Sequence, residues 1–305
     1  MRLLRGLWNA LTAARNITAN LIFLAIVAFI LVAIFSHETV TVPDKAALVV
    51  DPTGNIVEQK RAIDPLSSLL SSNRSQEPET LLRNIEKAIT KASTDNRIKA
   101  LVLNLDDLDS ASMSMLQELG DTIDAFKISG KRVYAFGSAY TQTQYYLAAH
   151  ADEVYIDKHA MPAIGGVFLP GFGVYPTFFK SALDKLKINF HIFRVGQYKS
   201  AVEPLMRDNM SDAAKQENLS WLGVLWDAYE TSVVKQRGMT RATFDAYTNH
   251  YDEELGQADN DPSKVAVKDG FVDELISRQE FDTRMKAVVG GDDSGYSNID
   301  FRDYL

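Results

Sequence analysis

The sequence contains no cysteine among its 305 residues. This absence excludes disulfides, thiolate zinc sites, iron–sulfur clusters and a cysteine nucleophile. It does not assign a compartment, because a chain without thiols suits reducing and oxidising surroundings equally. With 46% hydrophobic and 24% charged residues, the composition is that of a folded globular protein of one large domain or two ordinary ones.

Histidine is also scarce, and no pair has the spacing of a metal site on a helix or strand. The sequence lacks H-E-x-x-H, which excludes the usual zinc protease centre. The acidic pairs at 106–107 and 292–293 fit solvated loops better than cation sites, and the glycines of 165–173 fit no nucleotide-binding loop. We therefore expect no metal and no cofactor. The five histidines are His37, His150, His159, His191 and His250.

Positive charge is in short supply beyond the amino terminus. Residues 1–36 hold three arginines and no acidic residue, so residues 37–305 carry 29 basic against 40 acidic side chains, a net charge of −11. Binding to nucleic acid needs a basic face that can neutralise phosphates. We therefore expect no nucleic-acid partner.

One long apolar run lies near the amino terminus. Every residue from Leu21 to Phe35 is apolar, and residues 17–36 give a 20-residue segment, long enough to span the hydrocarbon core of a bilayer. A cleaved signal peptide is the alternative, but its apolar region is shorter and ends in small residues, whereas this one ends in Ile34-Phe35-Ser36. We predict an uncleaved transmembrane anchor at 17–36 that contacts membrane lipid.

The charges beside the anchor predict its orientation. Arg2, Arg5 and Arg15 precede it, and the positive-inside rule places such residues in the cytoplasm. Residues 1–16 then form a basic, amphipathic cytoplasmic segment, and residues 37–305 form one domain on the outer side of the membrane.

The remaining chain alternates between strand and helix patterns, which predicts an α/β fold with a mainly parallel sheet flanked by helices. Apolar runs predict strands at 45–51, 98–105, 132–136 and 153–156, and helical spacing predicts helices at 82–92, 116–126 and 142–150. Further along we expect a helix at 176–187, a strand at 188–194 and a long helix capped by Ser211.

Serine motifs give little sign of a nucleophile. G-x-S-x-G is absent, and the one Ser-x-x-Lys match, Ser232-Val-Val-Lys235, falls late in the predicted long helix. A nucleophile is usually placed at a helix start or a strained turn. We interpret this match as a chance occurrence.

Lys199 is the candidate catalytic residue. It lies just beyond the predicted strand 188–194, and the carboxyl ends of parallel strands are where open α/β sheets place reactive groups. A neutral lysine there would serve as a general base, although a solvated loop lysine explains the spacing alone at least as well.

The surrounding residues resemble the signal peptide peptidase A (protease IV) family, peptidase family S49, and specifically the amino-terminal half of its long, 67K-type tandem form. The likeness covers nearly the whole chain. It rests on Gly196-x-Tyr-Lys-Ser-Ala-Val-Glu-Pro204, Arg207-Asp-x-Met-Ser211, Gln144-Tyr-Tyr-Leu-Ala148, Leu183-Asp-Lys-Leu-Lys187 and Trp221-x-x-x-x-Trp226.

This resemblance implies a ClpP/crotonase-like fold and a membrane-bound serine endopeptidase that degrades cleaved signal peptides with a Ser/Lys dyad. Lys199 would be the base of the dyad. The body would face the periplasm from a bacterial inner membrane, with the amino terminus in the cytoplasm. A homo-oligomer with inward-facing sites is also implied.

The nucleophile of the family is not matched. Gln142 falls roughly where the family's serine-bearing half has its serine, and the glycine-rich oxyanion loop is replaced by residues 106–110, Asp-Asp-Leu-Asp-Ser. Ser138 and Ser200 are the nearest hydroxyls, and we expect neither to attack. The chain would need a serine-bearing second half or subunit, and its abrupt end after Gly290-Gly291 suggests an interrupted sequence.

Two alternatives remain open at this stage. One is a non-catalytic, membrane-anchored scaffold or interaction protein with a degenerate peptidase fold. The other is a crotonase-type acyl-CoA enzyme, which the anchor and the missing glycine-rich loop disfavour.

Overall fold

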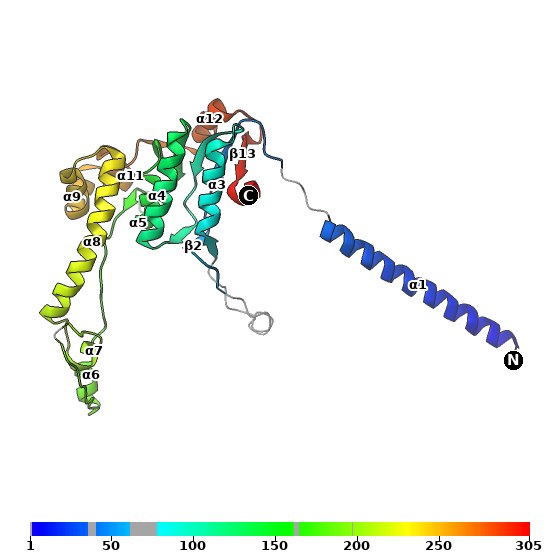
Figure 1. The fold of residues 1–305 in the computed structure, drawn as a ribbon, viewed down its shortest axis with the longest axis horizontal. Coiled ribbons are helices and arrows are strands. Elements are labelled where there is room, and N and C mark those ends of the chain that lie inside the picture. The colour runs from blue at the N-terminus through cyan, green and yellow to red at the C-terminus, as the bar shows by residue number, and fades with distance from the viewer. Residues whose placement is uncertain (1, 36–40, 62–77, 162–164, 197) are drawn as a thin grey trace. The chain divides into compact units, whose positions relative to one another are not determined.

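The computed structural model describes residues 2–35, 41–61, 78–161, 165–196 and 198–305 (Figure 1). The chain divides into two compact units, Met1–Thr41 and Val42–Leu305.

The amino-terminal unit contains one helix, α1 (Arg2–Phe35). Its segment Leu11–Val32 is long and apolar enough to cross a membrane, and none of that segment is buried inside the protein. Its aromatic residues Phe23 and Phe29 are 66% and 75% exposed, so the described part of this unit has no core that covers them. The predicted end of the anchor, Ser36, lies outside the described residues.

A six-stranded sheet forms the centre of the second unit. Its strands run in the order β10-β8-β6-β4-β1-β13, and every neighbouring pair is parallel. This confirms the predicted α/β class. The strands are β1 (Ala46–Val50), β4 (Ile98–Leu103), β6 (Arg132–Gly137), β8 (Glu153–Asp157), β10 (Glu274–Ile276) and β13 (Asn298–Asp300).

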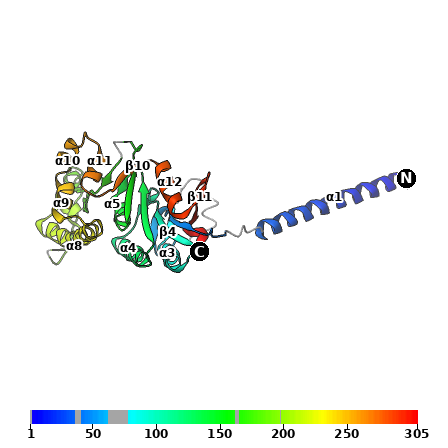
Figure 2. The same cartoon turned by 90° about the horizontal axis from the view of Figure 1, so that it is seen from above.

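The sheet is buried on both faces, which is why its strands read as nearly continuous apolar runs. Along β4, Leu101 and Leu103 join the larger core, whereas Ala100 and Val102 join a smaller core on the opposite face. The larger core is covered by α3 (Leu82–Thr94), α4 (Met113–Ile128) and α5 (Gln142–Ala148), and the smaller one by α12 (Arg278–Val289). Figure 2 shows the sheet between α3 and α4 on one side and α12 on the other.

Three small sheets complete the strands. β2 (Gly54–Val57), β3 (Glu79–Leu81) and β5 (Leu108–Ser110) pair in parallel, as do β7 (Tyr140–Thr141) and β9 (Val167–Phe168), and β11 (Gly291–Asp292) pairs antiparallel with β12 (Gly295–Tyr296). Gly54 has a φ of 68°, and a Cβ there would lie 1.9 Å from the oxygen of Pro78. Only glycine allows this close approach of β2 to β3.

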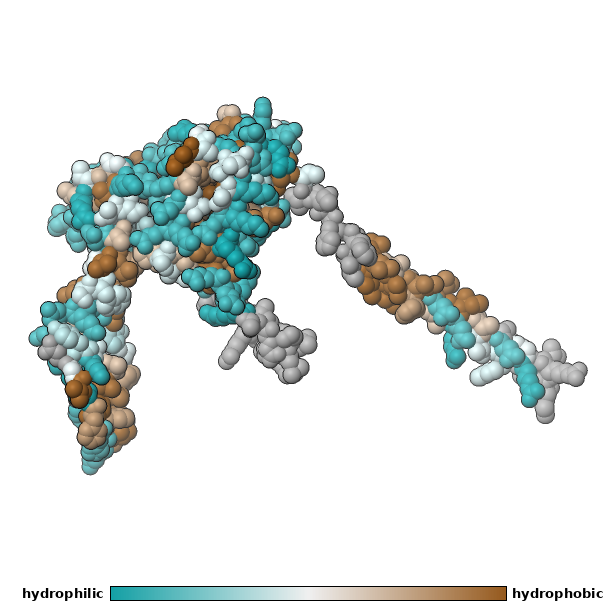
Figure 3. Space-filling model, in the orientation of Figure 1, coloured by the Kyte–Doolittle hydropathy of each residue, from teal (hydrophilic) through white to brown (hydrophobic). Residues whose placement is uncertain are grey.

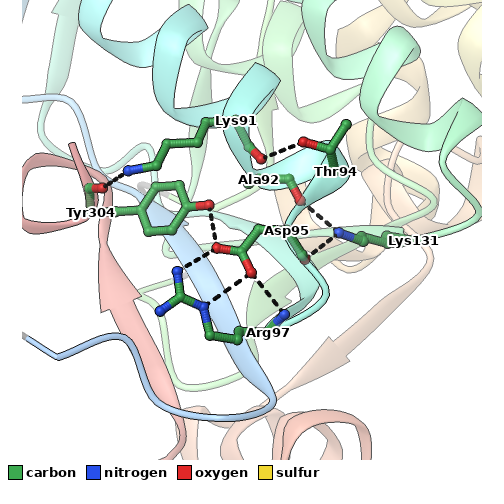
Figure 4. A network of polar contacts seen from close by, with 7 residues as sticks. All are labelled: Lys91, Ala92, Thr94, Asp95, Arg97, Lys131 and Tyr304. Atoms are coloured by element: carbon green, nitrogen blue, oxygen red, sulfur yellow. Dashed lines mark hydrogen bonds and ion pairs between the residues drawn. The ribbon is translucent and has the colours of Figure 1, made fainter.

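The last helix, α13 (Phe301–Tyr304), is tied to α3 by polar contacts (Figure 4). The Tyr304 hydroxyl donates to Asp95 Oδ2 at 2.9 Å, and Lys91 Nζ donates to the backbone oxygen of Tyr304 at 2.7 Å. Arg97 donates to the same Asp95 carboxylate, and the hydrogen bonds from Arg97 and from the Tyr304 hydroxyl lower the pKa of Asp95. These contacts hold the end of the chain against the body.

The remaining helices lie between β9 and α12. They are α6 (Lys180–Lys185), α7 (Glu203–Met206), α8 (Asp212–Arg237), α9 (Arg241–Asn249), α10 (Tyr251–Gln257) and α11 (Pro262–Lys268). Ser211 caps α8 by accepting a hydrogen bond from Ala214 N at 3.1 Å, so the predicted start of the long helix is confirmed.

Residues 169–225, called the arm below, project from the body with α6, α7 and the first half of α8 (Figure 1). The prediction for this region was wrong in two respects. The helix expected at 176–187 is only the short α6, and residues 188–194 form no strand. Phe190 and Phe193 are 51% and 99% exposed, because no strand of this chain pairs with the segment and no core covers it. Figure 3 shows the apolar surface that results on the arm.

Candidate active site

Lys199 lies on the arm between α6 and α7, and its side chain is exposed. The sequence placed it at the carboxyl end of a sheet strand, and this was wrong because residues 188–194 are not part of any sheet. Within the described part of the chain, its Nζ makes no hydrogen bond and no ion pair. The lysine is therefore presented on a projecting surface, open to a group from outside this chain.

The backbone at Lys199 is held by Arg194. Arg194 Nη1 donates a hydrogen bond to the Lys199 oxygen at 3.0 Å and lies 3.5 Å from Glu203 Oε1. One guanidinium thus joins the lysine's own peptide unit to the start of α7. Nη1 carries two N–H bonds, so this one nitrogen can be directed to both oxygens.

Glu203, the residue that Arg194 contacts on α7, is buried. It is only 2% exposed, and its Oε2 accepts a hydrogen bond from Ser211 N at 3.0 Å. Burial by itself would raise the pKa of Glu203, but the hydrogen bonds from Ser211 and the contact with Arg194 lower it below its ordinary value. Glu203 is therefore ionised at neutral pH and connects the lysine loop to the capped start of α8.

The sequence pattern did not predict a role for Arg194 or Glu203. A glutamate in the middle of a short polar loop looks like an ordinary surface residue. The proline that follows it, Pro204, is a signal that was available, since proline is favoured at the first turn of a helix and marks Glu203 as part of α7.

Ser200, next to the lysine, has a different partner. Its hydroxyl donates to Glu217 Oε2 on α8 at 3.5 Å, and it lines a small cavity of about 220 Å³ inside the arm together with Glu203 and Met210. The hydroxyl is therefore directed to α8 and makes no contact with the lysine ammonium among the described residues.

Gln142, which the family resemblance puts roughly where the serine-bearing half has its serine, is the first residue of α5. Its Oε1 accepts a hydrogen bond from Gly171 N at 2.8 Å, and its backbone oxygen accepts one from the Tyr229 hydroxyl at 2.9 Å. Thr141 and Gln144 form a capping box around this helix start. The Gln142 amide thus fastens the beginning of the arm to the body.

Ser138 sits beside Asp106 in an open pocket of about 450 Å³. Its hydroxyl donates to Asp106 Oδ2 at 3.2 Å, and its backbone N–H donates to Oδ1 at 3.1 Å. A carboxylate at this place would repel the negative charge that develops on a substrate oxygen during acyl transfer. The described structure does not bring Ser138 and Lys199 together, and no lysine lines this pocket.

No cluster of three or more metal-binding side chains occurs among the residues that the structure describes. The two acidic pairs have local partners, since Asp106 holds Ser138 and Asp292 accepts a hydrogen bond from Ser294 N at 2.8 Å. The geometry offers no cation site at either pair in this part of the chain.

The chain is similar to curated proteins along its whole length. It is 34% identical to Protease 4 of Haemophilus influenzae, covering 100% of this chain and 50% of that protein, and 32% identical to Protease 4 of Salmonella typhi, covering 97% and 49%. A chloroplastic serine protease SPPA of Arabidopsis thaliana is 31% identical over 48% of this chain and 20% of its own. The chain thus spans about half the length of the Protease 4 proteins that it matches.

Among solved structures, the chain resembles an enoyl-CoA hydratase from Mycobacterium avium subsp. paratuberculosis K-10. The identity is 15%, the TM-score is 0.28, and the match covers 80% of this chain and 94% of the other. A likeness this distant carries no argument about chemistry. The family is decided by sequence, because the model for peptidase family S49 matches residues 125–290. The chain belongs to peptidase family S49.

Proposed function

We propose that this chain supplies the general base, Lys199, of a membrane-anchored Ser/Lys endopeptidase that degrades cleaved signal peptides. The observation that carries the proposal is the unpaired Lys199 ammonium on an exposed arm, with its backbone held by Arg194 and the buried Glu203. A loop braced in this way, whose lysine has no partner within the described chain, fits a site completed from outside.

The lysine acts in both halves of the reaction. In its neutral form, Nζ takes the proton of the serine hydroxyl as that oxygen attacks the peptide carbonyl, and the proton passes to the leaving amine. In the second half Nζ takes a proton from the water that hydrolyses the acyl-enzyme. Contact with an apolar partner surface would favour the neutral amine, since desolvation disfavours the charged form of a lysine.

The nucleophile is proposed to come from a serine-bearing second half or subunit. The resemblance puts Gln142 roughly where the family has its serine, and the hydroxyl of Ser138, one of the nearest, is held by Asp106. The chain also spans only half of the Protease 4 proteins. The apolar side chains exposed on the arm, Phe193 and Tyr175 foremost, form the surface on which such a partner or a second copy would be seated.

We further propose how the chain is arranged across the membrane. Residues 17–36 serve as the anchor, with 1–16 in the cytoplasm and 37–305 in the periplasm of a bacterial inner membrane. The unburied apolar segment of α1 and the arginines before it support this arrangement.

The decisive experiment replaces Lys199 in the complete enzyme. Lys199→Ala is expected to lower peptide hydrolysis at least ~1000-fold, because the serine loses its base. The fold should stay intact, since the side chain is exposed and unpaired. Lys185→Ala is the matched control, because Lys185 is another exposed lysine on the arm. The measurement is turnover of a fluorogenic signal-peptide fragment, with circular dichroism to check the fold.

Wild-type turnover by Lys199→Ala would contradict the proposal and favour the alternative, a membrane-anchored scaffold with a degenerate peptidase fold. The purified 305-residue chain alone is expected not to hydrolyse peptides. Peptide turnover by that chain would show that it contains its own peptidase nucleophile.

A further inference from the structure

Three polar side chains, from α4, from α8 and from the turn after α5, form a chain of hydrogen bonds outside the lysine loop. Ser232 Oγ on α8 lies 3.3 Å from Nε2 of His150, which follows α5. The other ring nitrogen, His150 Nδ1, lies 3.0 Å from Asp124 Oδ1 on α4. A hydroxyl, an imidazole and a carboxylate joined in this order are the parts of a serine nucleophile, its base and the group that orients the base.

The carboxylate fixes which nitrogen of the ring carries the proton. Asp124 accepts from Nδ1–H, which leaves Nε2 with a free lone pair facing the Ser232 hydroxyl. Burial by itself would raise the pKa of Asp124, but the hydrogen bond from His150 lowers it below its ordinary value, so the carboxyl stays charged. Gln236 Nε2 donates to Asp124 Oδ2 at 2.6 Å and holds the second oxygen.

The imidazole is locked in place. His150 is 3% exposed, and its ring packs against Tyr146 with centroids 5.4 Å apart. Gly120 makes room for it, because a Cβ at that position would lie 2.6 Å from His150 Nε2. Lys127 Nζ donates to the His150 backbone oxygen at 3.0 Å. The imidazole is thus held by side chains of α4 and by the Tyr146 ring of α5.

The three groups open onto a pocket of about 570 Å³ between α4, α5 and α8. Gln117 and Lys235 also line it and carry the donors that a developing oxyanion requires. Lys235 stands one turn after Ser232 on the same helix. These two residues are the Ser-x-x-Lys pair, and no spacing in the sequence connects them with a histidine.

We propose that Ser232, His150 and Asp124 form a second nucleophilic site, separate from Lys199, that hydrolyses short carboxylic esters. Ser232 Oγ bonds to the ester carbonyl carbon while its proton moves to His150 Nε2. The ester C–O bond then breaks and the alkoxide leaves as the alcohol with that proton. Water attacks the acyl-serine, gives a proton to Nε2, and the carboxylic acid departs as Ser232 regains its hydrogen.

The lining of the pocket selects the substrate class. Three aspartates and one lysine line it: Asp121, Asp124, Asp227 and Lys235. This excess of negative charge favours a neutral or cationic ester over an anionic one. The proposal is limited to esters, whose alcohol leaves more readily than the amine of a peptide. It does not depend on the role of Lys199.

The test uses the purified full chain in detergent and a fluorophosphonate probe, which bonds to activated serines. We expect covalent labelling of Ser232 and hydrolysis of p-nitrophenyl acetate. Ser220 and Ser232 fall in one tryptic peptide, 216–235, so fragmentation of that peptide identifies the labelled serine. Ser220→Ala is the matched control, because Ser220 is exposed on the same helix.

Ser232→Ala is expected to lower labelling and ester turnover at least ~20-fold, and Ser220→Ala to leave both unchanged. Asp124→Asn keeps the shape of the side chain but removes the charge that holds the proton on His150 Nδ1. It should lower labelling and ester turnover at least ~10-fold while the circular dichroism spectrum is retained. An unlabelled Ser232, a label on another serine, or equal labelling of the folded Asp124→Asn chain would each overturn the proposal and leave the three groups as a cross-link between helices.

Discussion

Arg194 donates a hydrogen bond to the backbone oxygen of Lys199, at 3.0 Å, and the same guanidinium nitrogen lies 3.5 Å from the buried Glu203. The candidate base is therefore positioned through its main chain, while its ammonium is left free. This separation lets the loop be rigid before any partner arrives. It also makes Arg194 a positioning residue whose loss can be distinguished from loss of the base itself.

Arg194→Ala is expected to lower kcat of the complete enzyme about 10-fold with little change in KM, because the lysine remains but its loop is less well placed. Arg194→Lys should recover only part of the loss, since the lysine side chain is shorter and its ammonium would lie farther from the two oxygens. Steady-state kinetics on a signal-peptide fragment measure this. A purely structural role would instead lower stability without a separate fall in kcat.

The apolar surface of the arm predicts association. Phe193 is 99% exposed, and burying such a side chain contributes roughly 1.5–3 kcal/mol. Phe193→Asp should therefore weaken binding to the partner half, or self-association, about 10-fold or more. Ile128→Asp is the control, because Ile128 is 87% exposed but lies on α4 outside the arm. Sedimentation velocity in detergent compares the two, and equal effects would argue against the arm as the contact surface.

Two helical glycines are expected to respond to alanine in opposite directions. At Gly120 a Cβ would lie 2.6 Å from His150 Nε2, so Gly120→Ala should destabilise the fold by about 1–3 kcal/mol through overpacking. At Gly223 nothing lies within 4 Å, so Gly223→Ala should stabilise α8 by about 0.5–1 kcal/mol. Denaturant unfolding of the full chain in detergent checks both signs, and a stable Gly120→Ala chain would mean that the imidazole is not held as described.

Asp51, which follows β1, predicts a pH dependence of stability. Burial and the neighbouring Asp300 carboxylate raise its pKa from 3.8 to about 6, although Arg302 partly offsets them. The folded state therefore takes up this proton before the unfolded state does. The contribution of Asp51 to the free energy of unfolding therefore rises as pH falls through about 6, and it stops changing below about 3.8.

The measurement is thermal unfolding of wild type and Asp51→Asn between pH 7 and pH 5. The wild type is expected to gain stability relative to the variant as pH falls, because the asparagine cannot titrate. Asp109→Asn, which removes an exposed carboxylate on β5, is the control. A wild-type advantage over Asp51→Asn that shrinks toward pH 5 would contradict the assignment.

The sequence by itself determined the elements whose pattern reflects local burial. The apolar runs at β1, β4, β6 and β8 predicted their strands because a parallel sheet buries both faces, and Ser211 predicted the start of α8 because a helix needs its first N–H groups capped. The same reasoning failed at 188–194, whose alternating apolar residues look like a half-buried strand but lie exposed on the arm. An apolar pattern indicates that burying a segment is favourable, but it does not indicate whether the segment packs against its own chain or against a partner.

Only the tertiary structure decided which polar groups meet. The motif around Lys199 was visible in the sequence, but the contact of Arg194 with both Lys199 and Glu203 depends on how the arm folds. Asp124 lies on α4, Ser232 on α8 and His150 in the turn after α5, and no spacing along the chain relates them. Periodicity reports the neighbours that a helix or strand creates locally, whereas a site is made by side chains that packing brings together across long stretches of sequence.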